Sequence, residues 1–390
     1  MSDFITETTS RGWFSRIASS FGGMLFGFVL LLAMVALLFW NEGRAVQTAR
    51  SLAEGAGAVI AVASDAVDPA NEGRIVHVAG EVRSSEMVRD PEFGVQAAGV
   101  RLVRHAEMFQ WIEKQKSETR TKFGGGEETV TTYSYSRGWS DEAQDSSSFR
   151  QPQGHTNPEM RWRDRAFELS SAQLGARTLD VQTLGRIGGG EPLAVKPSDA
   201  ASIEQTFGWA GTAVVGGQIY LGEDPSAPKI GDQRISYELA PLGTISVIAQ
   251  QEGDGLAGYQ TSAGDVLLLV DRGNVPAAQM FADAVSANTA ITWIVRAAGI
   301  VFLSVAFMLT MGPIGVIADV IPFLGTLVRM GTGFVAFVLA IAVGTVVIAF
   351  AWFWYRPILS LAILAAGAIA VWLLSRYARS HAPEPQTATV

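Results

Sequence analysis

Four long apolar runs stand out against an otherwise mixed pattern of hydrophobic and polar positions. The first, residues 22–40, has no charged residue and is long enough to cross the hydrocarbon core of a bilayer as a helix. Three more runs predict spans at 291–312, 331–354 and 357–374. The pattern therefore predicts a multi-pass α-helical membrane protein with four spans.

The first run also resembles the apolar core of a signal peptide, because Arg11 and Arg16 precede it. The run is long for that role, however, and it ends at Trp40, a residue typical of the membrane interface. A retained transmembrane helix is the favoured interpretation.

The segment 313–330 is apolar but contains two prolines, Asp319 and Arg329. Such a broken segment predicts an interfacial or re-entrant stretch rather than a further span, with Asp319 and Arg329 facing headgroups or each other. The apolar runs themselves, with the second taken as 297–312, carry no ionisable residue. The lack of ionisable residues in these runs argues against a coupled transporter, because such proteins use charged groups inside the membrane.

Positive charges predict the orientation of the chain. Five arginines fall on the side of the termini and only Arg356 falls in the short opposite loop; the five are Arg11, Arg16, Arg329, Arg376 and Arg379. By the positive-inside rule, residues 1–21 and 375–390 are expected to be cytoplasmic. Residues 41–290 are then expected to be exoplasmic, in the periplasm of a bacterium or the lumen of a eukaryotic endomembrane.

The central segment 41–290 reads as a large β-rich α+β domain between the first and second spans. Alternating β-branched and aromatic residues predict strands at 74–82, 100–113, 127–139, 212–221, 233–239, 244–251 and 265–270. The run KFGGGEE is typical of a hairpin turn. Helices are expected near 160–175, at 198–207 and at 275–299, the last continuing into the second span.

Composition narrows the function classes. The chain is 48% hydrophobic, has a formal net charge of -8 and contains no cysteine. Disulfides and thiolate chemistry are therefore excluded, and nothing indicates a nucleic-acid partner. Basic charge is carried mostly by arginine, which is weakly typical of a bacterial source.

Candidate chemistry is sparse. The strand 100–113 places His105, Glu107 and Trp111 on one face, so His105 and Glu107 are positioned to share a metal ion or a proton. Two such groups on one strand do not make a site. Motifs for a serine nucleophile, a phosphate-binding loop or a dinucleotide are also missing from the sequence, so we expect no cofactor, no metal and no catalytic residues.

Small residues recur at a spacing of four in the apolar runs. Such positions let helices approach closely, within one chain or between copies. The candidates for helix packing or oligomerisation are Gly23, Gly27, Ala336, Ala340, Gly344, Ala362, Ala366 and Ala370.

The tetrapeptide NEGR occurs twice, at 41–44 (Asn41, Glu42, Gly43, Arg44) and at 71–74 (Asn71, Glu72, Gly73, Arg74). The residues that follow differ: the first copy leads into an alanine-rich stretch and the second into a β-branched strand. We expect both copies to redirect the chain, the first by ending the helix at the membrane surface and the second by starting a strand.

Blocks of sequence along the chain resemble the LUMA family, that is, transmembrane protein forty-three and its bacterial relatives. The blocks occur in this order: NEGRA, SLAEG, NEGRIVHV, DPEFGV, VRLVRHAEMFQWIE, YSYSRGWSDE, GHTNP, GDQRISYE, VIAQQ, WIVRAAG and FWYRP. The likeness runs from about residue 20 to 375 and is weakest at 160–230.

The resemblance implies four spans with a large lumenal or periplasmic domain between the first two. Animal members of the family sit in the endoplasmic reticulum and inner nuclear membrane, self-associate and are linked to nuclear-envelope organisation through lamins and emerin. Those partners do not transfer to a bacterial chain, for which the inner membrane is the expected location. The family offers no catalytic residues to map onto this sequence.

Three functional hypotheses follow. The leading one is a non-enzymatic membrane scaffold that self-associates in the bilayer and presents its exoplasmic domain to itself or to an unknown protein partner. A channel or transporter with 313–330 as a re-entrant gate is the alternative from another class. A hydrolase built on His105 and Glu107 comes last.

Overall fold

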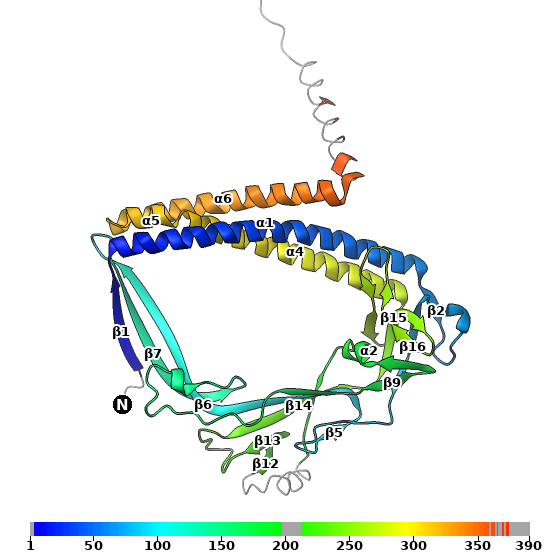
Figure 1. The fold of residues 1–390 in the computed structure, drawn as a ribbon. Helices are drawn as coiled ribbons and strands as arrows, with labels where there is room; N and C mark the ends of the chain where they lie inside the picture. The colour runs from blue at the N-terminus through cyan, green and yellow to red at the C-terminus, as the bar shows by residue number, and fades with distance from the viewer. Residues whose placement is uncertain are drawn as a thin grey trace, which may run out of the picture. The chain divides into compact units, whose positions relative to one another are not determined.

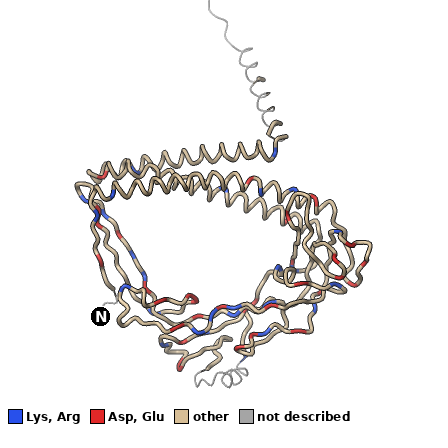
Figure 2. The backbone as a smooth tube through the Cα atoms, in the orientation of Figure 1, with Lys and Arg blue, Asp and Glu red and all other residues tan. Residues whose placement is uncertain are grey.

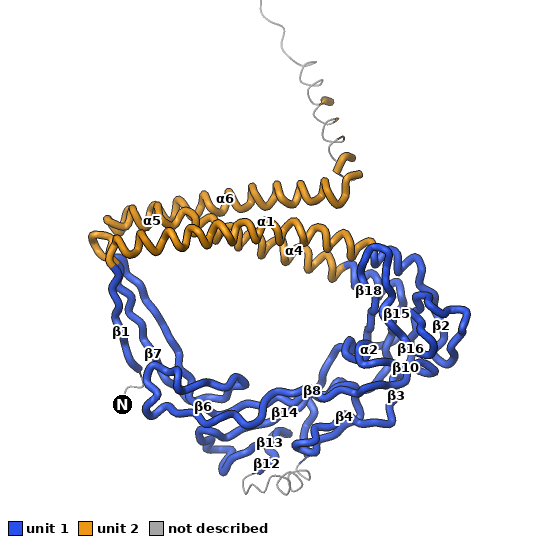
Figure 3. Tube along the Cα trace, in the orientation of Figure 1, with its two compact units in different colours: residues 1–11, 51–121, 127–285 blue, residues 12–50, 122–126, 286–390 orange. Residues whose placement is uncertain are grey.

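A computed structural model describes residues 4–196, 212–358, 360–362, 365, 369 and 372–373. The chain forms two compact units, each assembled from separate stretches of sequence (Figures 1 and 3). Unit 1 comprises residues 1–11, 51–121 and 127–285, and unit 2 comprises 12–50, 122–126 and 286–390. Unit 1 is β-rich, whereas unit 2 is built almost entirely from helices.

Three long helices carry the apolar runs. They are α1 (Trp13–Ala58), α4 (Ala277–Thr310) and α6 (Pro322–Tyr355), and each is long and apolar enough to cross a membrane. Long stretches of them bear no charged residue (Figure 2). Half of the fourth predicted span, 357–374, lies outside the described residues, and the described residues contain three candidate spans where four were predicted.

Helix boundaries differ from the expected ones in two places. The short helix α5 (Gly312–Ala318) follows α4, and α6 begins at Pro322, so the broken segment 313–330 is a helical corner rather than a separate stretch. Helix α1 continues through Asn41 and Gly43 to Ala58, so the predicted end at the first NEGR copy is wrong. The expected helix over 275–299 is confirmed as the first part of α4.

Unit 1 contains an eight-stranded and a seven-stranded sheet. The first has the order β1-β7-β6-β14-β13-β12, with β11 on β14 and β8 on β6. Its strands are β1 (Phe4–Arg11), β6 (Gly99–Thr121), β7 (Glu127–Ser140), β8 (Arg165–Glu168), β11 (Glu191–Leu193), β12 (Thr212–Val215), β13 (Gln218–Leu221) and β14 (Gln233–Pro241).

The second sheet has the order β19-β15-β16-β10-β9-β3-β2, and β15 also pairs with β3. Its strands are β2 (Ile60–Val62), β3 (Ile75–Arg83), β9 (Ser171–Leu174), β10 (Arg177–Asp180), β15 (Thr244–Glu252), β16 (Gly255–Ala257) and β19 (Leu269–Arg272). Two small ladders, β4 (Val88–Arg89) with β5 (Gln96–Ala97) and β17 (Tyr259–Gln260) with β18 (Val266–Leu267), complete the unit, together with the short helix α2 (Val181–Gly185).

Strand β6 shows how the sequence pattern builds the core of unit 1. Its inward face, which includes Leu102, Ala106 and Met108, is fully buried, whereas the alternate residues are half-buried. The inward residues join buried valines of β3 and the buried isoleucine, valine and alanine of β15 in one hydrophobic cluster. Alternation with a period of two therefore separates a core face from a face that is open to solvent.

The region 160–175 forms strands β8 and β9 rather than the expected helix. Its buried apolar residues include two pairs two positions apart, 160 with 162 and 172 with 174, and the buried Leu169 lies two positions after the partly buried Phe167. A spacing of two is that of a strand rather than of a helix. The expected helix at 198–207 lies outside the described residues.

The N-terminal residues belong to unit 1. Strand β1 pairs with β7 along its whole length, from Phe4 opposite Ser134 to Arg11 opposite Glu127. Backbone-paired strands lie within about 5 Å of each other, so a bilayer cannot separate them. The pairing therefore favours residues 4–11 on the same side of the membrane as the rest of unit 1, whereas the cytoplasmic segment 1–21 and the exoplasmic domain 41–290 stay predictions from the arginines.

Candidate functional site

The first NEGR copy lies in the middle of α1 and forms the centre of a polar network in unit 2. The Glu42 carboxylate is only 2% exposed. It accepts hydrogen bonds from Arg296 Nε (2.6 Å) and Nη2 (2.7 Å) on α4 and from Trp352 Nε1 (2.8 Å) on α6. One carboxylate thus joins three apolar helices through a bidentate ion pair and an indole N–H.

The neighbouring residues of the motif extend this network. Arg44 donates to Asn288 Oδ1 (2.9 Å) and to Thr292 Oγ1 (3.1 Å), and Asn41 donates to the Thr292 carbonyl (3.3 Å). The Asn288 side chain in turn donates to the backbone carbonyl of residue 45 (3.0 Å). Arg44 therefore bonds within the helical bundle rather than with lipid headgroups.

Gly43 is required by close packing. A Cβ atom at this position would lie 2.6 Å from the Tyr355 ring. The first NEGR copy is therefore a contact between helices, and the interpretation of it as the end of a helix is wrong.

The second NEGR copy behaves as predicted. It follows Asp68, which caps a short 3-10 helix (Pro69–Asn71), and Gly73 has a left-handed φ of 72° just before β3 begins. Glu72 accepts hydrogen bonds from the Gly253 backbone N–H at 3.0 and 3.2 Å. The same four residues thus make a turn in unit 1 and an interhelical contact in unit 2. The difference arises because a tetrapeptide does not by itself specify which distant residues pack against it.

A second ion cluster lies at the corner between α5 and α6. The Asp319 carboxylate is fully buried and accepts hydrogen bonds from Arg16 Nη2 (2.5 Å) and from Arg329 Nη1 (2.8 Å) and Nη2 (2.6 Å). The expected pairing of Asp319 with Arg329 is confirmed. Arg16, one of the arginines counted for the orientation of the chain, is buried in this cluster.

The small residues in the helices are used for packing inside the chain. A Cβ at Gly27 would lie 2.8 Å from the carbonyl oxygen of Ala306, and Gly344 faces Ile300. Ala336 and Ala340 are fully buried. Ala362 is exposed, Ala366 and Ala370 lie outside the described residues, and oligomerisation through these faces stays a prediction.

Gly23 and Gly27 make a matched pair for testing this packing. At Gly23 an added Cβ meets no described atom within 4 Å. Gly23→Ala is expected to leave stability unchanged or raise it by up to about 1 kcal/mol through helix propensity. Gly27→Ala should lower it by about 1–3 kcal/mol, because the backbone of α4 must move. Thermal unfolding in detergent measures both, and equal behaviour of the two variants would refute the close contact of α1 with α4.

The outward face of β6 in unit 1 does not bring His105 and Glu107 together. His105 Nδ1 lies 3.2 Å from Asp164 and its Nε2 lies 3.7 Å from Glu238. Glu107 pairs instead with Arg234 of β14. Within the described residues no group of three histidine or acidic side chains is placed to hold a metal ion. The arrangement therefore does not form the shared site on which the hydrolase hypothesis depends.

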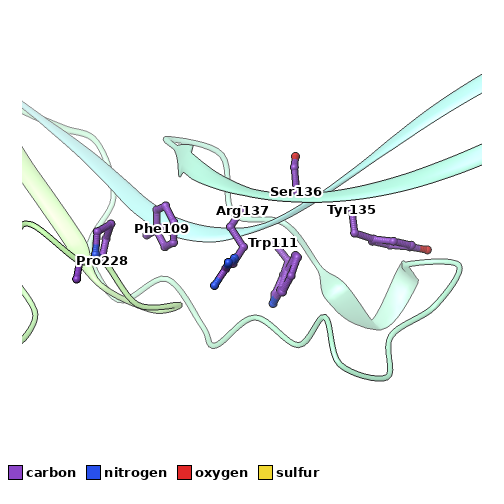
Figure 4. A pocket seen from close by; sticks show the side chains of 7 residues that line it. Phe109, Trp111, Tyr135, Ser136, Arg137 and Pro228 are labelled. Atoms are coloured by element: carbon purple, nitrogen blue, oxygen red, sulfur yellow. The ribbon is translucent and has the colours of Figure 1, made fainter. Parts of the chain in front are cut away.

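The same face carries a row of aromatic and arginine side chains. Arg137 stacks over Trp111 at 5.4 Å, and Arg234 stacks over Trp139 at 4.7 Å. Phe109 meets Trp139 edge-on, with ring centroids 5.5 Å apart. Phe109, Trp111, Arg137 and Pro228 line a pocket of about 480 Å³ together with Tyr135, Ser136 and Ala227 (Figure 4). We call the row Phe109, Trp111, Arg137 and Trp139, together with the pocket beside it, the aromatic face.

Trp111 is held in place from several sides. Asn157 accepts a hydrogen bond from its backbone N–H (2.7 Å) and donates one to its carbonyl (2.9 Å). His155 packs edge-on against the indole at 4.7 Å and stacks on Tyr135 at 4.0 Å. Burial, together with the hydrogen bond that it donates to Glu113, raises the pKa of Tyr135 to about 12 and keeps the phenol neutral. The aromatic face is therefore preorganised.

A buried cluster beneath the aromatic face is structural. Asp90 is fully buried and accepts hydrogen bonds from Arg104 (2.9 Å) and from the Tyr237 hydroxyl (2.9 Å). Burial and the nearby Asp90 raise the pKa of Tyr237. These groups satisfy one another inside the core, so they are not exposed to a ligand.

Sequence reasoning missed Arg296 and Trp352 as partners of Glu42. Both occur in blocks that carry the family resemblance, WIVRAAG and FWYRP. A lone arginine at the edge of an apolar run was the available signal, because such a charge needs a buried partner in a membrane.

Comparison with known proteins places these features in a family. The family model described as Transmembrane protein 43 matches residues 108–357. Transmembrane protein 43 of Homo sapiens is 32% identical over 371 residues, covering 92% of this chain and 91% of that protein. The protein of the same name in Rattus norvegicus is 32% identical over 366 residues, covering 91% and 90%.

A more distant relative is also similar over most of its length. Transmembrane protein 43 homolog of Drosophila melanogaster is 27% identical over 358 residues, covering 88% of this chain and 92% of that protein. These relatives are animal proteins and give no support to the expected bacterial source. No solved structure matches the chain.

Proposed function

Because the chain belongs to the Transmembrane protein 43 family, we propose that it is a non-enzymatic membrane scaffold that self-associates and binds a protein partner through the aromatic face. The helical unit anchors it in the bilayer. The preorganised, half-exposed row of Phe109, Trp111, Arg137 and Trp139 is the observation that carries this proposal.

The chemistry of the aromatic face suits a protein surface. Tryptophan, tyrosine and arginine dominate the binding energy of protein interfaces, and rigid aromatic side chains lose little entropy on binding. Trp111 is fixed by Asn157 and His155 before any partner arrives. Shape and charge, rather than a reactive group, are therefore what this face offers.

The charged groups of the helical unit favour an anchor over a channel. Asp319, the acidic group of the suggested gate, is bonded to Arg16 and Arg329, and Glu42 is bonded to Arg296 and Trp352. A conducting path needs polar groups that are free to exchange ions or water. Networks closed on themselves serve better to hold helices together.

Proximity labelling in the native membrane, followed by comparison of the wild type with Trp111→Ala/Arg137→Ala, tests the partner. We expect a specific neighbour to be lost in the variant while membrane insertion is unchanged. Phe302→Ala, an exposed substitution on α4, serves as the matched control. An identical set of neighbours for wild type and variant would contradict the role of the aromatic face.

Native mass measurement in mild detergent tests self-association separately. A strictly monomeric protein would contradict the proposed self-association. The bacterial inner membrane stays a prediction from arginine usage, to be checked by fractionation.

A further inference from the structure

The loop between β6 and β7 belongs to the helical unit although both strands belong to unit 1. It comprises residues 122–126 and has the sequence KFGGG, and its predicted role as a hairpin turn is confirmed. Figure 3 shows this loop in the colour of unit 2. At its tip the Phe123 side chain is 88% exposed. Transfer of such an exposed phenylalanine side chain from water to an apolar environment would be favourable.

Hydrogen bonds fasten the loop to the helical corner. The Gly124 N–H donates to the Val320 carbonyl (3.1 Å), and the Gly125 carbonyl accepts from Arg16 Nη1 (2.5 Å). Arg16 simultaneously binds the buried Asp319. The loop is thus held by the same ion cluster that closes the corner between α5 and α6.

Gly125 brings the loop close to α1. Its φ is 77°, and a Cβ atom there would lie 2.3 Å from the Trp13 ring. Trp13 in turn donates its indole N–H to the Val316 carbonyl (2.9 Å). Only glycine permits both the left-handed backbone and this approach, so the contact is specific to the residue present.

The corner to which the loop is fastened is rich in exposed apolar side chains. Phe14 is 80% exposed, and Phe323 and Ile317 also face outward. Phe14 and Phe323 lie at the starts of α1 and α6, and Ile317 lies near the end of α5. Aromatic side chains next to arginines at helix ends are the pattern found where protein meets the headgroup region of a bilayer.

We propose that the β6–β7 loop is an additional membrane anchor, in which Phe123 inserts into the interfacial layer of the lipid bilayer. The proposal rests on the membrane assignment of the helical unit and is independent of the scaffold function. Hydropathy cannot reveal this contact, because a single phenylalanine among glycines forms no apolar run. The occupant is lipid because Phe123 is exposed on a loop that is bonded to a corner whose exposed side chains are apolar and lie at the ends of the candidate spans.

The absence of cysteine from the chain allows a direct test. Phe123→Cys, labelled with the environment-sensitive fluorophore NBD, is reconstituted in phosphatidylcholine vesicles containing shallow nitroxide-labelled lipid. We expect a blue-shifted emission and at least several-fold stronger quenching than for NBD at Val215→Cys. Val215 is the matched control, because it is apolar, 50% exposed and beside a glycine turn in the β12–β13 hairpin of unit 1.

A third labelled position separates the possible failures. Phe26 lies on α1 and is 62% exposed, so NBD at Phe26→Cys reports on the helical unit itself. Quenching at 26 without quenching at 123 would overturn the loop anchor alone. Absence of quenching at both positions would overturn the membrane assignment on which the anchor rests.

A separate variant tests whether the contact with the helical corner holds the β6–β7 loop in place. Gly125→Val on the Phe123→Cys background places a side chain against Trp13 and strains the left-handed turn, so the loop should leave the corner. We expect the quenching at 123 to fall toward that of the Val215 control, with the far-ultraviolet circular dichroism unchanged. Full quenching in this variant would show that Gly125 and Arg16 do not position the anchor.

Discussion

Replacing Glu42 by alanine is expected to destabilise the helical unit by about 3–5 kcal/mol, because it leaves the buried Arg296 without a counter-ion. It also removes the acceptor for the Trp352 indole N–H. Both groups are partly buried, so hydration does not fully compensate either loss. Unfolding titrations in detergent, followed by tryptophan fluorescence, measure the change.

The second NEGR copy supplies the matched control. Glu72 is exposed and accepts hydrogen bonds from a turn, so Glu72→Ala should cost no more than about 1 kcal/mol. The double variant Glu42→Leu/Arg296→Met should recover most of the loss, since it removes the unpaired charge together with the pair. A cost for Glu42→Ala as small as that for Glu72→Ala would contradict the interhelical network.

Single cysteines in β1 and elsewhere in unit 1 are expected to react from the same side of the membrane. Thr8→Cys reports on β1, and Ser85→Cys reports on an exposed position between β3 and β4. The reason is the continuous ladder between β1 and β7, which no bilayer can interrupt. A membrane-impermeant maleimide applied to sealed proteoliposomes, before and after permeabilisation, gives an all-or-none readout at each position.

The ladder can also be trapped covalently. Thr6 lies directly opposite Thr132, and directly opposed residues of antiparallel strands are within disulfide range. Thr6→Cys/Thr132→Cys should therefore form an intramolecular disulfide under mild oxidation, whereas Thr6→Cys/Thr119→Cys should not. Labelling of Thr8→Cys and Ser85→Cys from opposite sides would show that β1 is unpaired and would restore the orientation inferred from arginines.

If the two positions share a side, α1 does not make a simple single crossing. Strand β1 precedes α1 and β2 follows it, and both strands belong to unit 1. The positive-inside rule assumes that each apolar run crosses once. Arg16 would then weigh little in that rule, because its charge is paired with Asp319.

Sequence patterns located the regular elements well where one pattern extended over many residues. Three of the four apolar runs became long helices, and the alternation at 100–113 became the buried and open faces of β6. The prediction failed at 160–175, where strands of four residues are too short to separate a period of two from a helical one. It failed again at Asn41 and Gly43, whose turn-forming tendency was overridden by contacts with α4 and α6.

The candidate sites were less predictable than the fold. Trp111 was placed on the open face of β6, but the pocket beside it needs Arg137 from β7 and Pro228 from the loop before β14. His105 and Glu107 share a face, yet each found another partner across the sheet. A strand pattern specifies the face on which a side chain lies, and it leaves the neighbouring strand unspecified.

The sequence by itself determined the apolar helices, the β-rich character of the central segment and the family, because periodicity, composition and ordered motifs are properties of neighbouring residues. Tertiary structure alone decided that one NEGR copy joins three helices and the other makes a turn. It also decided that Arg16 meets Asp319, 303 positions away, and that β1 joins β7. A buried charge needs a counter-ion, and the fold can bring that counter-ion from any part of the chain. The local sequence around the charge therefore does not predict which residue will pair with it.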